Sequence, residues 1–181
     1  MAMNLAERIQ QKLNVEELQK IDPDTGNEIT TGKPANKFYQ LAIPAVLTGL
    51  YNFTRLDEKN HDILNTNSEN FLSLIFGEKK DTVIAKIAGL SGTPVSETND
   101  KLQEIGIATI STLQENLPER PLDKDVKELL TGQRHNILLY LDPALQMGNF
   151  IKDDTVDDST NKMEGPVSNL MHNIGQIFSE S

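Results

Sequence analysis

Hydrophobic side chains recur every third or fourth residue along most of the chain, with polar residues between them. This spacing is the period of an α-helix, whereas the period-two alternation that marks strands is nearly absent. We therefore predict a compact all-α fold of about seven to nine helices, each burying its apolar stripe against a neighbour. Helices are expected at residues 5–21, 38–53, 81–88, 94–117, 126–130, 137–141, 143–147 and 167–178, and the Pro-Glu-Arg-Pro run at 118–121 ends one of them. Residues 71–76 are expected to add an apolar turn or two, and the polar connection at 58–70 has room for a short helix at 61–64.

Individual residues predict where these helices begin, end or bend. Asn14, with an acid three positions later, is typical of a helix N-cap, so residues 5–21 form either one continuous helix or two short helices broken near Asn14. Pro44 marks either a kink or the first turn of a new helix, because proline has no amide proton to donate. Gly89 is expected to end one helix in the left-handed conformation, and Gly106 to interrupt the next helical stretch.

The chain is expected to have two parts. Residues 1–150 form a helical domain, with N-terminal helices at 5–65 and a core at 71–150, and residues 151–181 form an acidic, mobile loop followed by a terminal helix. The terminal helix has the clearest amphipathic pattern, with apolar residues at offsets 0, 3, 4, 7, 10 and 11: Val167, Leu170, Met171, Ile174, Ile177 and Phe178. This candidate interaction helix either completes the core of its own domain or docks into the groove of a partner.

Composition and charge narrow the classes of function. The chain has no cysteine, which excludes disulfides, thiolate zinc sites and a cysteine nucleophile and fits a reducing compartment such as the cytoplasm. No apolar run approaches the ~18 residues of a membrane span, and no secretory signal is visible at the first residues. With 27 acidic against 17 basic residues the net charge is −10, which disfavours binding to a phosphate backbone.

Residues 82–104 have the spacing of a helix-turn-helix. A small residue, a turn glycine and two apolar residues stand where two crossing helices need them: Ala85, Gly89, Leu90 and Val95. The second helix, however, carries three acids against one base: Glu97, Asp100 and Glu104 against Lys101. Because acids in a reading helix are repelled by phosphate, a compact helical corner with no DNA contact is the favoured interpretation.

One segment of this region resembles a known family. The sequence FGEKKDTVIAKIAGLSGTPVSETNDKLQEIGIATISTLQENL, Phe76–Leu117, is similar to the YidB-like family of bacterial domains of unknown function, and residues 142–178 resemble the acid-rich stretch and short terminal helix with which that family closes. The resemblance covers residues 40–178 and implies a bacterial helical protein with a homeodomain-like corner and no catalytic residues. The chain departs from the family in having only 11 glycines and in pairing its aspartates at 153–158.

Potential metal ligands do not gather at usable spacings. Three histidines lie far apart in the sequence, at His61, His135 and His172. Residues 22–36 are turn-rich and are expected to form a loop. Its first twelve residues miss the calcium-loop pattern, because the glycine stands at the fifth place and a lysine stands where the twelfth-place glutamate belongs. The aspartates at 153–158 are expected to form a solvated loop in preference to a divalent-ion site. We therefore expect no metal and no cofactor.

No familiar catalytic motif is present: the sequence has no Gly-x-x-x-x-Gly-Lys, no Gly-x-Ser-x-Gly and no His-Glu-x-x-His. We therefore expect a soluble, non-enzymatic helical protein of the bacterial cytoplasm that works through protein contacts, with an unknown partner or a second copy. A DNA-associated regulator using residues 82–104 is the alternative, and an enzyme or small-ligand binder with a pocket between helices is a third class.

Overall fold

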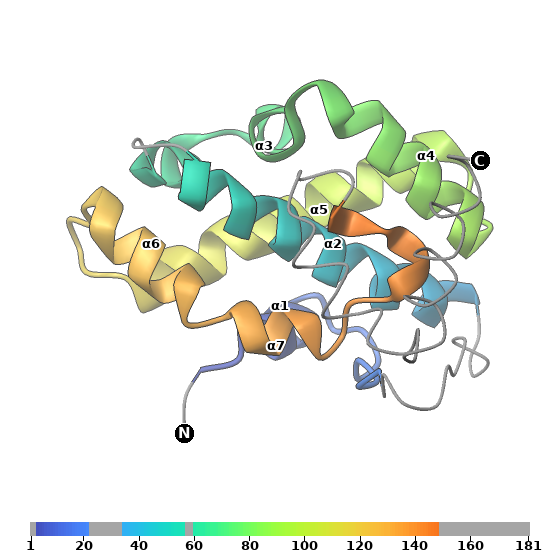
Figure 1. The fold of residues 1–181 in the computed structure, drawn as a ribbon, viewed down its shortest axis with the longest axis horizontal. Helices are drawn as coiled ribbons and strands as arrows, with labels where there is room; N and C mark the ends of the chain where they lie inside the picture. The colour runs from blue at the N-terminus through green and yellow to red at the C-terminus, as the bar shows by residue number, and fades with distance from the viewer. Residues whose placement is uncertain (1–2, 22–33, 57–59, 149–181) are drawn as a thin grey trace, which may run out of the picture.

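The computed structural model describes residues 3–21, 34–56 and 60–148. Within these ranges the chain forms α-helices and short 3-10 helices and no strand, which confirms the all-α prediction (Figure 1). The elements are α1 (Leu5–Lys12), α2 (Pro34–Leu56), η1 (Asn60–Asn65), α3 (Ser68–Phe76), η2 (Gly77–Lys79), α4 (Lys80–Ser91), α5 (Val95–Asn116), α6 (Asp123–Thr131), α7 (Arg134–Leu138) and η3 (Pro143–Leu145). Of the loop predicted at 22–36, residues 34–36 instead form the first turn of α2, where Pro34 is tolerated because the first helical amides have no partner in the helix. Residues 22–33 lie outside the described residues, as does the part at 151–181 with its interaction helix.

Helix α2 is the centre of the packing. It contacts α1, α3, α4, α5, α6 and α7, and in Figure 1 it runs between α3 and α4 on one side and α1 and α7 on the other. All residues from 41 to 50 are buried, as expected for a helix that is covered on every face. Pro44 lies inside this one helix, so it does not begin a new one. The helix continues past the proline, and the Thr48 hydroxyl donates a hydrogen bond of 2.8 Å to the Pro44 carbonyl.

The N-terminal segment contains one helix instead of the predicted pair or continuous run. Helix α1 ends at Lys12, and Asn4 caps it by accepting hydrogen bonds from the amides of the first turn. Asn14 does not cap a second helix: its φ of 51° is left-handed, a conformation that asparagine tolerates at helix ends. The non-helical chain beyond it is held by Gln40, whose side chain accepts a hydrogen bond of 2.7 Å from the Gln19 amide.

Helices α4 and α5 contact each other, but the residues that define the predicted helix-turn-helix spacing do not form the contact between them. Helix α4 continues past Gly89 to Ser91, and the left-handed residue at its end is Gly92, with φ 74°. Ala85 and Gly89 are exposed on α4, and Val95 is 57% exposed at the start of α5. The core-facing stripe of α4 is instead Val83, Ile84, Ile87 and Ala88. The predicted spacing therefore does not describe how these helices pack.

Two glycines let the rings of α3 approach neighbouring helices closely. A Cβ added to Gly106 on α5 would lie 2.7 Å from Cδ1 of Phe71, and one added to Gly49 on α2 would lie 2.4 Å from Cε1 of Phe76. The prediction that Gly106 interrupts its helix is wrong, because α5 runs without a break from Val95 to Asn116. The glycine serves packing between helices instead.

Candidate functional site

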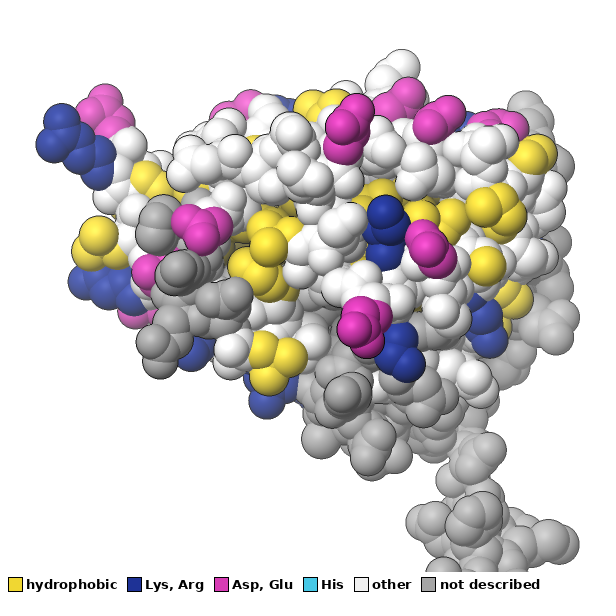
Figure 2. Space-filling model, turned by 90° about the horizontal axis from the view of Figure 1, so that it is seen from above, with side chains coloured by type: hydrophobic (Ala, Val, Ile, Leu, Met, Phe, Trp, Pro, Cys, Tyr) yellow, Lys and Arg dark blue, Asp and Glu magenta, His cyan; other side chains and the backbone are white. Residues whose placement is uncertain are grey.

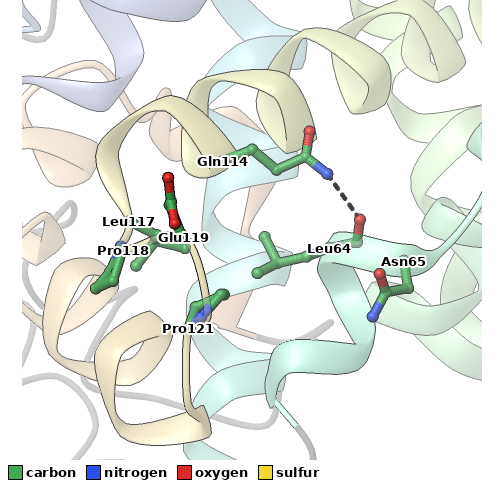
Figure 3. Close-up of a pocket in the computed structure, with 7 residues that line it drawn as sticks. All are labelled: Leu64, Asn65, Gln114, Leu117, Pro118, Glu119 and Pro121. Atoms are coloured by element: carbon green, nitrogen blue, oxygen red, sulfur yellow. Dashed lines mark hydrogen bonds between the residues drawn. The ribbon is translucent and has the colours of Figure 1, made fainter.

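A surface cleft of about 360 Å³ opens where the connection between α5 and α6 passes η1 (Figure 3). We call it the Glu119 cleft, after the ionisable side chain in its lining. Its walls come from η1, the end of α5 and the connection: Leu64, Asn65, Gln114, Leu117, Pro118, Glu119 and Pro121. Residues about fifty positions apart in the sequence thus meet at one surface feature.

The wall formed by the connection follows from its two prolines. Helix α5 ends where Leu117 adopts an extended conformation, with φ −107° and ψ 160°. Pro118 and Pro121 follow, and proline restricts its own φ and cannot donate a helical hydrogen bond. At the far end the Leu122 amide donates a hydrogen bond of 2.8 Å to the carboxylate of Asp125, in the first turn of α6. The connection is thereby fixed at both ends.

The opposite wall is tied to α5 by a hydrogen bond. The Gln114 side-chain amide donates to the carbonyl oxygen of Leu64 over 3.0 Å, the dashed line of Figure 3. Leu64 is only 8% exposed, so its side chain belongs to the floor of the cleft, whereas Asn65 is exposed at the rim. In this view Glu119 and Asn65 stand on opposite sides of the cleft.

The described lining is suited to binding and contains no pair of groups for proton transfer. Among the described residues that line the cleft, Glu119 is the one ionisable side chain, beside the two amide side chains of Asn65 and Gln114; the others are leucine and proline. General acid–base or nucleophilic chemistry needs a second group within hydrogen-bond reach of the first. A hydrophobic floor with a few polar groups at its rim is instead typical of a recognition site.

The acidic character predicted for the second helix of the corner is confirmed. Glu97, Asp100 and Glu104 are all exposed on α5, at spacings of three and four residues that place them on one face. The single base nearby, Lys101, is paired with the Glu97 carboxylate at 2.6 Å and lies 5.2 Å from the centre of the Phe38 ring. This helix therefore presents negative charge to any phosphate.

The face of the molecule shown in Figure 2 gives no further support for a role on DNA. On the face shown in Figure 2, basic side chains stand singly among acidic and hydrophobic ones, and the coloured residues form no basic patch. Because electrostatic attraction to phosphate is the minimum that DNA-binding proteins show, we do not propose a DNA-associated function.

Other sequence-predicted positions do not assemble into a site among the described residues. His135 is exposed on α7; the side chain of His61, and all of His172, lie outside the described part of the chain. No group of three or more histidines, aspartates or glutamates that could hold a metal occurs within residues 3–21, 34–56 and 60–148. None of the helices in these ranges is long and apolar enough to cross a membrane.

A partly buried polar network that the sequence did not predict joins α1 to the segment after α7. The Tyr140 hydroxyl donates a hydrogen bond of 2.8 Å to the carboxylate of Glu7, which also accepts one of 2.9 Å from the side chain of Asn4. Burial, with the Glu7 hydrogen bond as the next cause, raises the pKa of Tyr140 to about 12. The phenol therefore stays protonated at neutral pH, and its hydrogen bond to Glu7 helps to hold α1 to the segment after α7.

No family model matches this chain, and no curated protein or solved structure is significantly similar to it. The lining of the Glu119 cleft and the exposed side chains around it are therefore the features that bear on function.

Proposed function

We propose that this protein works through contacts with other proteins and has no catalytic activity of its own. The observation that carries the proposal is the lining of the Glu119 cleft, which combines a leucine and proline floor with one carboxylate and two side-chain amides. Protein interfaces have this composition, with an apolar centre surrounded by a polar rim. The cleft is also shaped by a connection that is fixed at both ends, so little ordering is needed when a partner binds.

An exposed leucine extends the apolar surface next to the cleft. Leu122 follows Pro121 directly, precedes α6 and is 59% exposed, whereas Val126 and Leu130 of α6 are buried. Covering apolar surface stabilises a complex by roughly 25 cal/mol per Å² removed from water. Leu122 therefore marks the side of the cleft on which a partner gains most from contact.

Photo-crosslinking in cells that express the protein tests the proposal. The photoreactive residue p-benzoylphenylalanine replaces Leu122 at the cleft or, as a control, the exposed Glu78 of η2. We expect irradiation to give discrete higher-mass species from position 122 and not from position 78. Equal products from both positions, or none from position 122, would contradict a contact surface at this end of the molecule.

The terminal segment is the second element that we propose to take part in contacts. Its apolar residues at 167–178 have the pattern of an amphipathic helix. Deleting residues 152–181 separates its two interpretations. A fall of many degrees in melting temperature would show that the helix completes its own core, whereas unchanged stability with loss of self-association in sedimentation would show an interaction element.

We also propose that the protein is a bacterial, cytoplasmic relative of the YidB-like family. The support is the resemblance of Phe76–Leu117, a segment that spans η2, α4 and α5 and so coincides with complete elements of the fold. The cysteine-free composition supports a reducing compartment. An experimental structure of a YidB-like domain tests the relation, since we expect its two matching helices to pack on a third at a glycine equivalent to Gly106.

A further inference from the structure

We propose that the Glu119 cleft binds a short peptide segment of a partner protein in which an apolar side chain stands next to a lysine or arginine. This inference rests on the proposed function and adds the chemistry of the partner. It follows from the volume and lining of the cleft, from the charge at its rim and from the charge of the chain itself.

The apolar side chain of the peptide has a place on the floor. Leu64, Leu117 and Pro121 supply apolar surface inside a cleft of about 360 Å³, near the lower end of the range of ligand-binding pockets. That volume suits the side chains of a short segment and is small for a whole helix or domain face. Leu64 is held by the hydrogen bond from Gln114, and Pro121 by its own ring, so the floor is formed before binding.

The basic side chain of the peptide is selected by Glu119. Its side chain is exposed in the lining. Among the described residues, no lysine or arginine forms a salt bridge with its carboxylate. An exposed ion pair contributes little affinity, so we assign binding strength mainly to the apolar side chain and charge preference to Glu119. On the opposite side of the cleft, the exposed amide of Asn65 is available to the peptide backbone.

Charge also argues for a separate molecule over the other possible occupants. Nucleic acid would place phosphates against the Glu119 carboxylate. The chain's own end, residues 149–181, contains six acidic and two basic residues, so it has the same sign of charge as the rim. A second copy of this chain brings a net charge of −10 to the encounter, whereas a basic peptide is attracted from a distance.

Nuclear magnetic resonance titration of the full-length, ¹⁵N-labelled protein tests the inference. The probes are the capped pentapeptides Ala-Lys-Leu-Lys-Ala, Ala-Glu-Leu-Glu-Ala and Ala-Lys-Ala-Lys-Ala. We expect the first to shift the backbone amides of Asn65, Gln114 and Glu119 in a saturable way. The second loses the charge attraction and the third loses the apolar side chain, so both should bind at least about threefold more weakly.

Two matched variants separate recognition by Glu119 from the general effect of charge. E119Q and E104Q remove one exposed carboxylate each, but Glu104 lies on α5 outside the cleft lining. We expect E119Q to weaken binding of the lysine–leucine probe about threefold to fivefold and to reduce its salt dependence, while E104Q stays near wild type.

Several results would overturn the inference. They are the absence of shifts at cleft amides, equal binding of all three probes, equal losses in E119Q and E104Q, or shifts confined to residues 167–178. A specific crosslink from position 122 together with any of these results would leave the proposed function standing and reject only the peptide chemistry. Absence of both the crosslink and the shifts would reject the two together.

Discussion

Helices α3 and α1 lie on opposite sides of α2 in Figure 1 and are held to the core by different means. At α3 the contact depends on shape, because phenyl rings lie directly on glycine residues of α2 and α5. At α1 an apolar contact is supplemented by side-chain hydrogen bonds from the α7 region. Two parts of one small core are therefore sensitive to different changes. The α3 contact is sensitive to a single added carbon, whereas the α1 contact is sensitive to the loss of a hydrogen-bond donor or acceptor.

A second set of hydrogen bonds that hold α1 is made by Gln133. Its side-chain oxygen accepts a hydrogen bond of 2.9 Å from the Leu5 amide, and its side-chain nitrogen donates one of 2.9 Å to the Met3 carbonyl. Gln133 is only 6% exposed, so these groups satisfy each other away from water. A helix begins with amides that have no partner inside the helix, and Gln133 supplies one of the missing acceptors.

The largest effect is expected at the ring that lies on Gly106. Phe71→Ala removes a fully buried phenyl group and leaves a cavity between α3 and α5, which costs about 3–5 kcal/mol of unfolding free energy. Urea unfolding followed by circular dichroism measures the loss. Phe71→Leu is the control, since it keeps most of the apolar volume and should cost clearly less. A loss in Phe71→Leu as large as that in Phe71→Ala would contradict the assignment of the effect to lost apolar volume and the cavity.

A smaller effect is expected from adding one carbon on the facing helix. Gly106→Ala places a Cβ 2.7 Å from the Phe71 ring, which is 0% exposed and has little room to turn. Overpacking of about 1–3 kcal/mol outweighs the gain of up to about 1 kcal/mol from alanine in a helix, so a net loss is expected.

Gly89→Ala is the matched control for that substitution. It lies inside α4, where an added Cβ has no atom within 4 Å, and it should stabilise the protein by about 0.5–1 kcal/mol. Urea unfolding of both variants gives the comparison. Changes of the same sign would mean that helix propensity, and not the ring, governs both positions.

The sequence predicted the helices better than their contacts. Hydrophobic periodicity places most helices because each apolar stripe is a local property; α3 and its stop at Gly77 are examples. The roles of glycines are not predictable from local sequence. A glycine can end a helix, lie at an exposed helical position or allow two helices to approach closely, and only the neighbouring helix distinguishes these roles. Sequence alone predicts an interruption at Gly106, where α5 is continuous, and a helix end at Gly89, whereas α4 ends at Ser91 before Gly92.

The candidate site was not predictable from the sequence. The prolines at 118 and 121 indicated the end of a helix, but nothing local relates them to Leu64 and Asn65 across about fifty residues. The hydrogen bonds that hold α1 are not predictable for the same reason, since Gln133 contacts Leu5 over a separation of 128 residues. Polar residues carry no periodic signal for such partners. The acidic face of α5 was predictable because its residues are neighbours on one helix.

On the α1 side, removing the hydrogen-bonding groups of Gln133 is expected to cost about 1–2 kcal/mol. Gln133→Met keeps the length of the side chain but leaves the Leu5 amide without its acceptor. Hydrogen exchange of α1 amides should accelerate more than that of α5 amides, because the loss is local. Gln133→Glu is the control: it retains an acceptor for Leu5 and should protect α1 better than methionine. Equal hydrogen exchange of the α1 amides in the two variants would show that the acceptor supplied by Gln133 does not help to hold α1.

The smallest effect at neutral pH, and the one that depends on pH, is expected from Tyr140→Phe. Loss of the hydrogen bond to Glu7 costs about 0.5–1.5 kcal/mol at pH 7, where Asn4 still contacts the Glu7 carboxylate. The pKa of Tyr140 is about 12 in the folded protein against 10.0 for the free group, so between these values the folded state holds a proton that the unfolded state has lost. Stability supplied by the phenol is therefore complete well below pH 10, begins to fall as the pH approaches 10 and is lost as the pH rises to about 12. Urea unfolding from pH 7 to 10.5 should show that the difference in unfolding free energy between wild type and Tyr140→Phe narrows above pH 9.5. Tyr39→Phe is the control, because Tyr39 lies outside the network. Parallel pH profiles for wild type and Tyr140→Phe would mean that the phenol does not help to hold α1.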